Sequence, residues 1–165
     1  MTFAYLSGPI IHANLRKDEF YQAIVNYLES RGIRVFAPQF LKSDDPAEIY
    51  TRDVQQVRKC DFLIGEVSNP SLGVGMEIML AIELGKPVIL FRNRSSENLS
   101  RMVLGADGKV LFEYSSIDEV IENLEGINLT ALTISTCPLC PSKVGELTNN
   151  RVRCISCSAY SSYGG

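Results

Sequence analysis

Short apolar runs alternate with amphipathic segments along the chain as far as residue 124. The apolar runs are typical of buried β-strands, and they occupy residues 3–7, 33–36, 62–67, 88–91 and 109–114. Between them, apolar residues recur at helical spacing and predict helices at about 16–30, 46–60, 75–84, 99–104 and 116–124. Strands that alternate with helices favour a parallel sheet. We therefore expect an α/β fold, Rossmann-like or flavodoxin-like, with a five-stranded parallel sheet flanked by helices.

Polar loops follow three of the predicted strands, at residues 8–16, 67–75 and 92–98. Ligands of parallel sheets bind beyond the carboxyl ends of the strands, so we expect the functional site among these loops. The predicted helix 75–84 is apolar nearly all round, which indicates burial on more than one side. We predict that a second subunit covers its outer face; the alternative is that the loop 92–104 does so.

Size, charge and the chain start narrow the class of protein. The 165 residues, 45% of them hydrophobic, suit one domain plus a small appendage. A net charge of −3 disfavours general attraction to nucleic acid or to anionic membranes. No apolar run is long enough to span a bilayer, and the start MTFAYLSGPI predicts a strand instead of a signal peptide. We expect a cytoplasmic protein.

Four of the five cysteines form two Cys-x2-Cys pairs, thirteen residues apart: Cys137, Cys140, Cys154 and Cys157. In an intracellular chain this spacing favours metal ligation over disulfides. Four thiolates predict a structural Zn²⁺ in a zinc ribbon, and iron in a rubredoxin-like site is the alternative. We expect an α/β domain at 1–126 and a ribbon at 133–160, with a linker in the region 126–136.

The most informative stretch for chemistry is 61–84. A turn-rich loop after the strand leads to Gly73 and Gly75, which open the predicted helix, and to Glu77 in its first turn. Backbone N–H groups at a helix start favour anions, and glycines allow a ligand to approach closely. The helix dipole would keep Glu77 ionised, which suits nucleophilic attack on an anomeric carbon. The alternative is that Glu77 merely stabilises the start of the helix.

The run EVSNPSLGVGME, residues 66–77, resembles the signature of the 2′-deoxynucleoside 5′-phosphate N-hydrolases, a branch of the nucleoside deoxyribosyltransferase-like proteins. Residues 5–8, the pair Arg52–Asp53 and the segment 98–106 agree with the same family, so the resemblance spans residues 3 to about 125. It implies a fold of the deoxyribosyltransferase type. It also implies hydrolysis of 2′-deoxynucleoside 5′-monophosphates to free base and deoxyribose 5-phosphate, with no cofactor for catalysis.

The same resemblance implies residue roles. Glu77 would be the nucleophile, Asp53 would hold the sugar and assist proton delivery to the leaving base, and Tyr5 would orient Glu77. The remaining predicted substrate contacts are Ser7, Gly8, Arg16, Ser71, Gly73, Gly75 and Ser100. Ser71 and the two glycine N–H groups would bind the 5′-phosphate, and Ser100 would reach it from the second subunit of a homodimer with a shared active site.

Other features leave the activity open. The loop that begins Gly8-Pro9 resembles the transferase branch, so base exchange by a nucleoside 2-deoxyribosyltransferase is an alternative. A non-catalytic nucleotide-binding module is a second alternative. Arg92 and Arg94 either add positive potential for a nucleotide or form a solvated pair. Glu66 and Asp61 bracket the third strand, where we expect a structural or supporting role.

Overall fold

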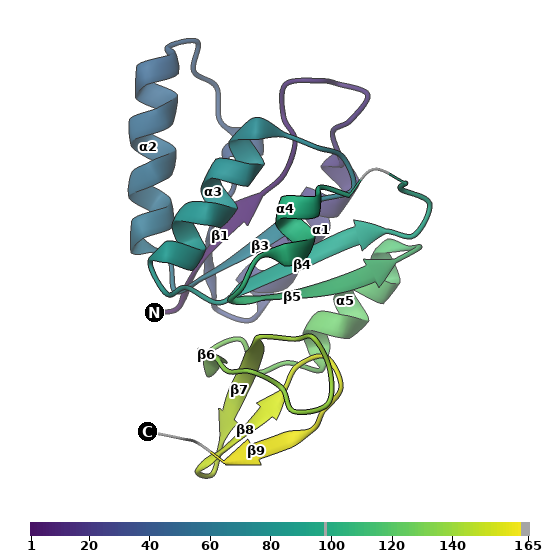
Figure 1. Ribbon diagram of the computed structural model, residues 1–165. Helices are drawn as coiled ribbons and strands as arrows, with labels where there is room; N and C mark the ends of the chain where they lie inside the picture. Colours follow the sequence, from purple (N-terminus) through teal and green to yellow (C-terminus); the bar gives the residue numbers. More distant parts are fainter. Residues whose placement is uncertain (98, 163–165) are drawn as a thin grey trace.

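A computed structural model describes residues 1–97 and 99–162, so Asn98 of the family motif lies outside the described residues. Five strands form one parallel sheet: β1 (Phe3–Ser7), β2 (Arg34–Phe36), β3 (Phe62–Glu66), β4 (Val88–Asn93) and β5 (Lys109–Tyr114). Their order across the sheet is β2-β1-β3-β4-β5 (Figure 1). The predicted five-stranded parallel sheet is therefore confirmed.

Helices cover both faces of this sheet (Figure 1). They are α1 (Asp18–Ser30), α2 (Pro46–Lys59), α3 (Leu72–Glu83), α4 (Arg101–Gly105) and α5 (Ile117–Glu125), with a short 3₁₀ helix at Pro38–Phe40. The side chains of α2 and α3 share one apolar cluster with Tyr5 and Leu63, and those of α1 and α5 share another with Leu6 and Ile64. Burial on both faces explains why the strands read as continuous apolar runs.

The strand order reverses between β1 and β3. From β1 the chain crosses to β2 on one side, and from β3 it crosses to β4 on the other. Parallel sheets bind ligands in the crevice at such a switch point, beyond the carboxyl ends of the strands. Ser7 of β1 pairs with Gly65 of β3 at this edge, so the loops 8–17 and 67–71 border the crevice.

Helix α3 begins at Leu72, three residues earlier than expected. Ser71 has an extended backbone as its N-cap, and the N–H of Gly75 donates to the Ser71 carbonyl at 3.0 Å. The predicted start at Gly75 was therefore wrong: both glycines lie inside the helix. Glycine disfavours helix locally, and here the closing of the first turn outweighs that preference.

The C-terminal module is a four-stranded antiparallel sheet. Its strands are β6 (Leu132–Ile134), β7 (Val144–Thr148), β8 (Arg151–Cys154) and β9 (Tyr160–Ser162). The region 126–136, expected to be a linker, is instead ordered: Ile127 and Leu129 are buried, and β6 pairs with β7. We call residues 132–162 the ribbon.

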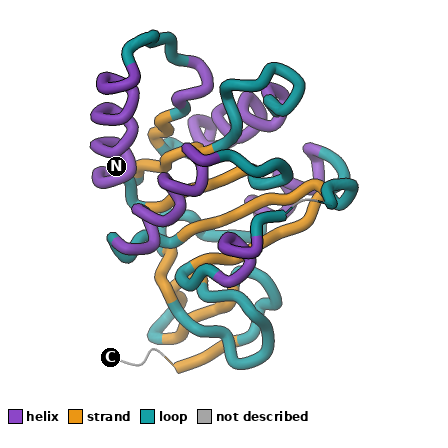
Figure 2. Tube along the Cα trace, turned by 45° about the horizontal axis from the view of Figure 1, so that its top comes forward, coloured by secondary structure: helices purple, strands orange, loops and turns teal. Residues whose placement is uncertain are grey.

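The ribbon packs directly on the α/β sheet layer. Val144 and Ile155 belong to the same buried cluster as Leu124 of α5, and the N–H of Lys143 donates to the carbonyl of Lys109 at 2.9 Å. Lys109 is the first residue of β5, so the ribbon docks at the amino ends of the strands, away from the crevice (Figures 1 and 2). Within the described residues, α1 to α5 all fall short of the length and apolarity that crossing a membrane requires.

Candidate active site

Glu77 is held by two residues of β1. The Tyr5 hydroxyl donates to Oε1 of Glu77 at 2.9 Å, and the Ser7 hydroxyl donates to Oε2. Residues two apart on a strand face the same side, so Tyr5 and Ser7 both point toward α3. Both are fully buried. The pair fixes both oxygens of the carboxylate and so sets its orientation.

The environment of Glu77 differs from the one the sequence predicted. Glu77 is the sixth residue of α3, beyond the first turn, where the helix dipole has little effect. Burial raises its pKa to about 7, although the hydrogen bonds from Ser7 and Tyr5 oppose the rise and the charge of Asp53 adds to it. The expectation of a dipole-stabilised anion was therefore wrong. Glu77 titrates near neutrality, as groups used in proton-coupled chemistry often do.

Tyr5 remains a hydrogen-bond donor over the whole physiological range. Burial raises its pKa strongly, and the negative charges of Glu77 and Asp53 raise it further. A tyrosine in this state is neutral and can donate only its hydroxyl proton to the carboxylate beside it. Its ring also lies 5.5 Å from that of Phe36, which packs it in place.

Asp53 comes from α2, the helix in which the sequence predicted it. It is 9% exposed, and Arg52 Nε lies 2.7 Å from its Oδ1. The guanidinium of Arg52 lies over the Phe36 ring, 5.7 Å from its centroid. The charge of Asp53 raises the pKa of both Glu77 and Tyr5, so Asp53 acts electrostatically on the hydrogen-bonded pair of Tyr5 and Glu77. Arg52 was recognised in the sequence only as part of a motif; in the structure its positive charge lies next to the carboxylate of Asp53.

The start of α3 has unused donors. Ser71 makes no capping bond with its side chain, and the N–H groups of Leu72, Gly73 and Val74 have no acceptor in the described part of the chain. The Gly75 N–H, by contrast, is spent on Ser71, so only one of the two predicted glycine donors is free. A Cβ added at Gly73 or Gly75 would meet nothing within 4 Å, which leaves room for a ligand or a second subunit.

Two other predicted substrate contacts have structural partners. Arg16 donates to Oδ1 of Asp18 at 2.7 Å and to the carbonyl of Gln39 at 3.1 Å, so its guanidinium is already engaged. At Gly8 an added Cβ would lie 2.4 Å from the ring of Tyr21, so only glycine allows this close packing. Both residues therefore hold the loop 8–17 in place.

Gln39 is a candidate that the sequence did not reveal. It lies in the 3₁₀ helix after β2 and is 4% exposed. Its Nε2 donates to the carbonyl of Leu6 at 3.1 Å, whereas its Oε1 is buried with no partner among the described residues. Buried polar atoms are nearly always paired, so an orphaned acceptor next to the end of β1 is a candidate ligand contact. A glutamine in a polar loop carries no such signal in sequence.

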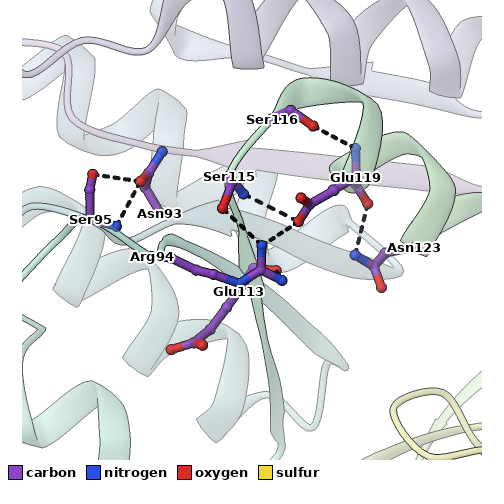
Figure 3. Close-up of polar contacts among 8 residues, drawn as sticks. All are labelled: Asn93, Arg94, Ser95, Glu113, Ser115, Ser116, Glu119 and Asn123. Atoms are coloured by element: carbon purple, nitrogen blue, oxygen red, sulfur yellow. Dashed lines mark hydrogen bonds and ion pairs between the residues drawn. The ribbon is translucent and has the colours of Figure 1, made fainter.

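Ser100 and the two arginines have polar partners other than Glu77. Ser100 caps α4, where its hydroxyl accepts from the N–H of Val103 at 3.5 Å. Arg94 points to α5, where it contacts the Ser115 hydroxyl at 2.9 Å and Glu119 at 2.6 Å (Figure 3). Arg92 donates to the carbonyl of Ser96 at 2.7 Å. Arg94 thus contacts the α5 surface, and Arg92 contacts the loop after β4.

The four predicted metal ligands converge in the ribbon: Cys137, Cys140, Cys154 and Cys157. Their sulfur atoms all lie within 4.8 Å of one another. The Cys137–Cys157 and Cys140–Cys154 sulfur distances are 3.5 and 3.6 Å, and tetrahedral Zn²⁺ with bonds of about 2.3 Å requires sulfur separations of about 3.8 Å. The N–H groups two residues after Cys137 and Cys154 point at those sulfurs, at 3.4 Å each. The donor set therefore fits one tetrahedral metal ion.

Comparison with known proteins identifies the class to which this fold and site belong. Residues 4–128 match the family profile described as nucleoside 2-deoxyribosyltransferase. The chain therefore belongs to that family, which confirms the resemblance seen in the sequence.

Individual relatives agree with this assignment. A Thermofilum pendens protein with the assigned name 2′-deoxynucleoside 5′-phosphate N-hydrolase 1 is 35% identical over 74% of this chain and 92% of its own length. The mouse (Mus musculus) 5-hydroxymethyl-dUMP N-hydrolase is 41% identical over 46% of this chain and 45% of its own length. Among solved structures, a Clostridium botulinum CMP N-glycosidase superposes with a TM-score of 0.59 at 22% identity, covering 75% of this chain and 99% of that one, a likeness of fold.

Proposed function

We propose that the protein hydrolyses the N-glycosidic bond of 2′-deoxynucleoside 5′-monophosphates and releases free base and deoxyribose 5-phosphate. The observation that carries this proposal is the geometry around Glu77, whose two oxygens are held by Tyr5 and Ser7, with Asp53 beside it. N-glycosidic cleavage needs one acid to attack and one to handle a proton, and these two supply them. The names of the most similar relatives point to the same reaction.

The mechanism follows from the protonation states. In its ionised form, Glu77 attacks C1′ of the deoxyribose and forms a glycosyl ester, while the C1′–N bond breaks and its electron pair leaves with the base. Asp53 assists delivery of a proton to the departing base. Water then hydrolyses the ester: its OH group goes to C1′, Glu77 returns as a carboxylate, and the proton that the water gives up replaces the one taken up by the base. With a pKa of about 7, Glu77 is ionised in a large fraction of molecules at neutral pH.

The two ends of the substrate have separate candidate partners. For the 5′-phosphate, the Ser71 hydroxyl and the free N–H groups at the start of α3 form an anion site of the kind found at helix N-termini. For the base, the unpaired Oε1 of Gln39 offers an acceptor. Replacing Gln39 with methionine, of similar size, should change the ranking of substrates by base, and an equal loss on every base would contradict this role.

A homodimer with a shared active site accounts for the exposed apolar surface of α3 and α4. Leu72, Met76 and Met79 of α3 are 91, 59 and 53% exposed, and Met102 of α4 is 81% exposed. Surfaces of this kind mark contacts between proteins. In the dimer, Ser100 would reach the phosphate bound at the other subunit's Ser71. Leu99 and Val103 also pack against the apolar cluster to which α3 contributes, so the segment 99–104 and a second subunit would both cover this part of the chain.

Subunit mixing tests the shared site. Glu77→Ala and Ser100→Ala variants, each of low activity alone, should regain activity when mixed, because one hybrid site then has both residues intact. Sedimentation as a monomer at micromolar concentration would contradict the dimer, and no recovery on mixing would contradict the shared site.

In the ribbon, Zn²⁺ would be a structural ion, because four thiolates leave no open coordination position. Free thiol ligands suit a reducing compartment, in line with the predicted cytoplasmic location. Because the ribbon docks at the amino end of β5, it does not cap the crevice of its own chain.

Incubation with a panel of deoxynucleoside monophosphates, with and without a second free base, tests the reaction. We expect free base and deoxyribose 5-phosphate whether or not the second base is present, and loss of turnover with retained nucleotide binding in Glu77→Ala. Base exchange on an unphosphorylated deoxynucleoside would instead show a deoxyribosyltransferase. Binding without turnover by the intact protein would show a nucleotide-binding module.

A further inference from the structure

Glu66 is a fully buried acid that the proposed reaction does not use. It is the last residue of β3 and has no measurable exposure. Alternation along β3 places it on the face of α1 and α5, opposite the face that carries Glu77. The other residues of β3 on the face of α1 and α5 are apolar, so the fold alone gives no reason for a carboxylate here. Burying an acid costs free energy unless its oxygens receive hydrogen bonds.

Both oxygens of Glu66 receive hydrogen bonds, and most come from Ser68. The Ser68 hydroxyl donates to Oε1, and the Ser68 N–H donates to Oε2 at 3.3 Å. The Tyr114 hydroxyl of β5 donates to Oε1 at 2.9 Å. Burial raises the pKa of Glu66, and the hydrogen bonds from Ser68 and Tyr114 oppose that rise. The charge of Lys17 also opposes the rise.

Ser68 links this acid to the loop in front of α3. Its hydroxyl accepts from the N–H of Asn93 at 2.8 Å, and its carbonyl accepts from the Ser96 hydroxyl. Ser68 is 1% exposed. It lies three residues before Ser71, with Pro70 between them. Glu66 and Ser68 thus tie the ends of β3, β4 and β5 to one point at the base of the loop 68–71.

We propose that Glu66 is a positioning residue: by holding Ser68, it sets the loop 68–71 so that Ser71 and the free N–H groups at the start of α3 face the substrate's 5′-phosphate. This inference rests on the proposed function and adds a component to it. Proline stiffens the loop, so the position fixed at Ser68 is passed on to Ser71. The effect of Glu66 should therefore fall on phosphate recognition and not on the glycosidic bond.

The Glu66→Gln variant tests this role, with Asp61→Asn as the matched control. Glutamine has one acceptor oxygen, and its NH₂ group faces a donor, so at least one hydrogen bond from Ser68 is lost. Asp61 lies just before the other end of β3 and is exposed; it accepts from the Phe3 N–H at 2.8 Å, which asparagine can still do. Both changes convert an acid to its amide, one at each end of the same strand.

We expect Glu66→Gln to raise KM for a deoxynucleoside monophosphate by on the order of tenfold, the effect of losing one buried hydrogen bond. The change in kcat should be smaller. KM for the same deoxynucleoside without phosphate should stay unchanged, and Asp61→Asn should match the wild type on both substrates. Ser68→Ala should reproduce the Glu66→Gln pattern. Equal losses on both substrates, or no change in KM for the monophosphate, would overturn the inference.

Binding of inorganic phosphate separates this inference from the proposed reaction. If the wild type hydrolyses no deoxynucleotide, the proposed function fails, and calorimetric titration with inorganic phosphate still measures the anion site. Weaker phosphate binding by Glu66→Gln than by the wild type would support the positioning role. Equal affinities, or no phosphate binding by the wild type, would overturn it.

Discussion

The hydroxyl of Tyr5 lies 2.9 Å from a carboxylate oxygen of Glu77, although 72 positions separate the two residues in the chain. This hydrogen bond joins β1 to α3 across the point where the strand order reverses. Because burial keeps Tyr5 protonated, its hydroxyl donates to Glu77 and does not place a second negative charge beside that carboxylate. Ser7 completes the same arrangement from two positions further along β1.

The pH profile should report the pKa of Glu77. We expect kcat/KM to rise with pH through about 7, because attack requires the carboxylate. Ser7→Ala removes a hydrogen bond that stabilises the ionised form, so the rise should move to higher pH. Ser30→Ala, which removes an exposed hydroxyl at the end of α1, is the control and should leave the profile in place. A wild-type rise centred near 4.5, the ordinary value for Glu, would contradict the assignment.

Replacing Asp53 with asparagine should lower kcat about 10²–10⁴-fold, the usual contribution of a proton-transferring group. The loss should be smaller for substrates whose bases leave readily without protonation. Asp45→Asn is a matched control on the same helix, since Asp45 caps α2 through the Ala47 N–H and asparagine caps equally well. Steady-state kinetics on a series of bases measures both variants. A uniform loss across the series would argue against proton delivery by Asp53.

Stability should also depend on the protonation of Glu77. Its pKa is higher in the folded chain than the ordinary 4.5, so the folded state favours the protonated acid. The wild type should therefore lose stability relative to Glu77→Gln as pH rises from about 4.5 to about 7, with a constant difference above that. Urea unfolding of both proteins at several pH values measures this. If the stability of the wild type relative to Glu77→Gln instead increased between about pH 4.5 and pH 7, the predicted sign would be wrong.

Metal removal should destabilise the whole chain. Elemental analysis should find about one zinc per chain, as expected for four thiolate ligands. Chelation should then lower the temperature of a single unfolding transition, because Val144 and Ile155 share a core with Leu124. Added zinc should restore the original transition, which serves as the control. A chelated protein with unchanged unfolding, or with a separate transition for the ribbon, would contradict this coupling.

Local patterns predicted much of the fold, because strand and helix periodicity and the Cys-x2-Cys spacing depend on neighbouring residues. The start of α3 was predicted too late in the chain, because Gly73 and Gly75 have low helix propensity; the helix nevertheless includes both of them. The region 126–136 was expected to be a linker because its pairing partner, β7, lies further along the chain. Gln39 escaped notice for a similar reason, since its burial depends on distant elements.

The sequence by itself determined the alternation of strands and helices, the four cysteines at metal-ligand spacing and the acid at position 77 within a recognisable family motif. Tertiary structure alone decided that the carboxylate of this acid is held by Tyr5 and Ser7 and that its pKa is raised to about 7. It also decided that Glu66 is tied to Ser68 and that the ribbon packs at the amino end of β5. A residue's type and spacing are local properties. Its pKa and its partners depend on segments far away in the chain, which exclude solvent from the residue and bring charges near it.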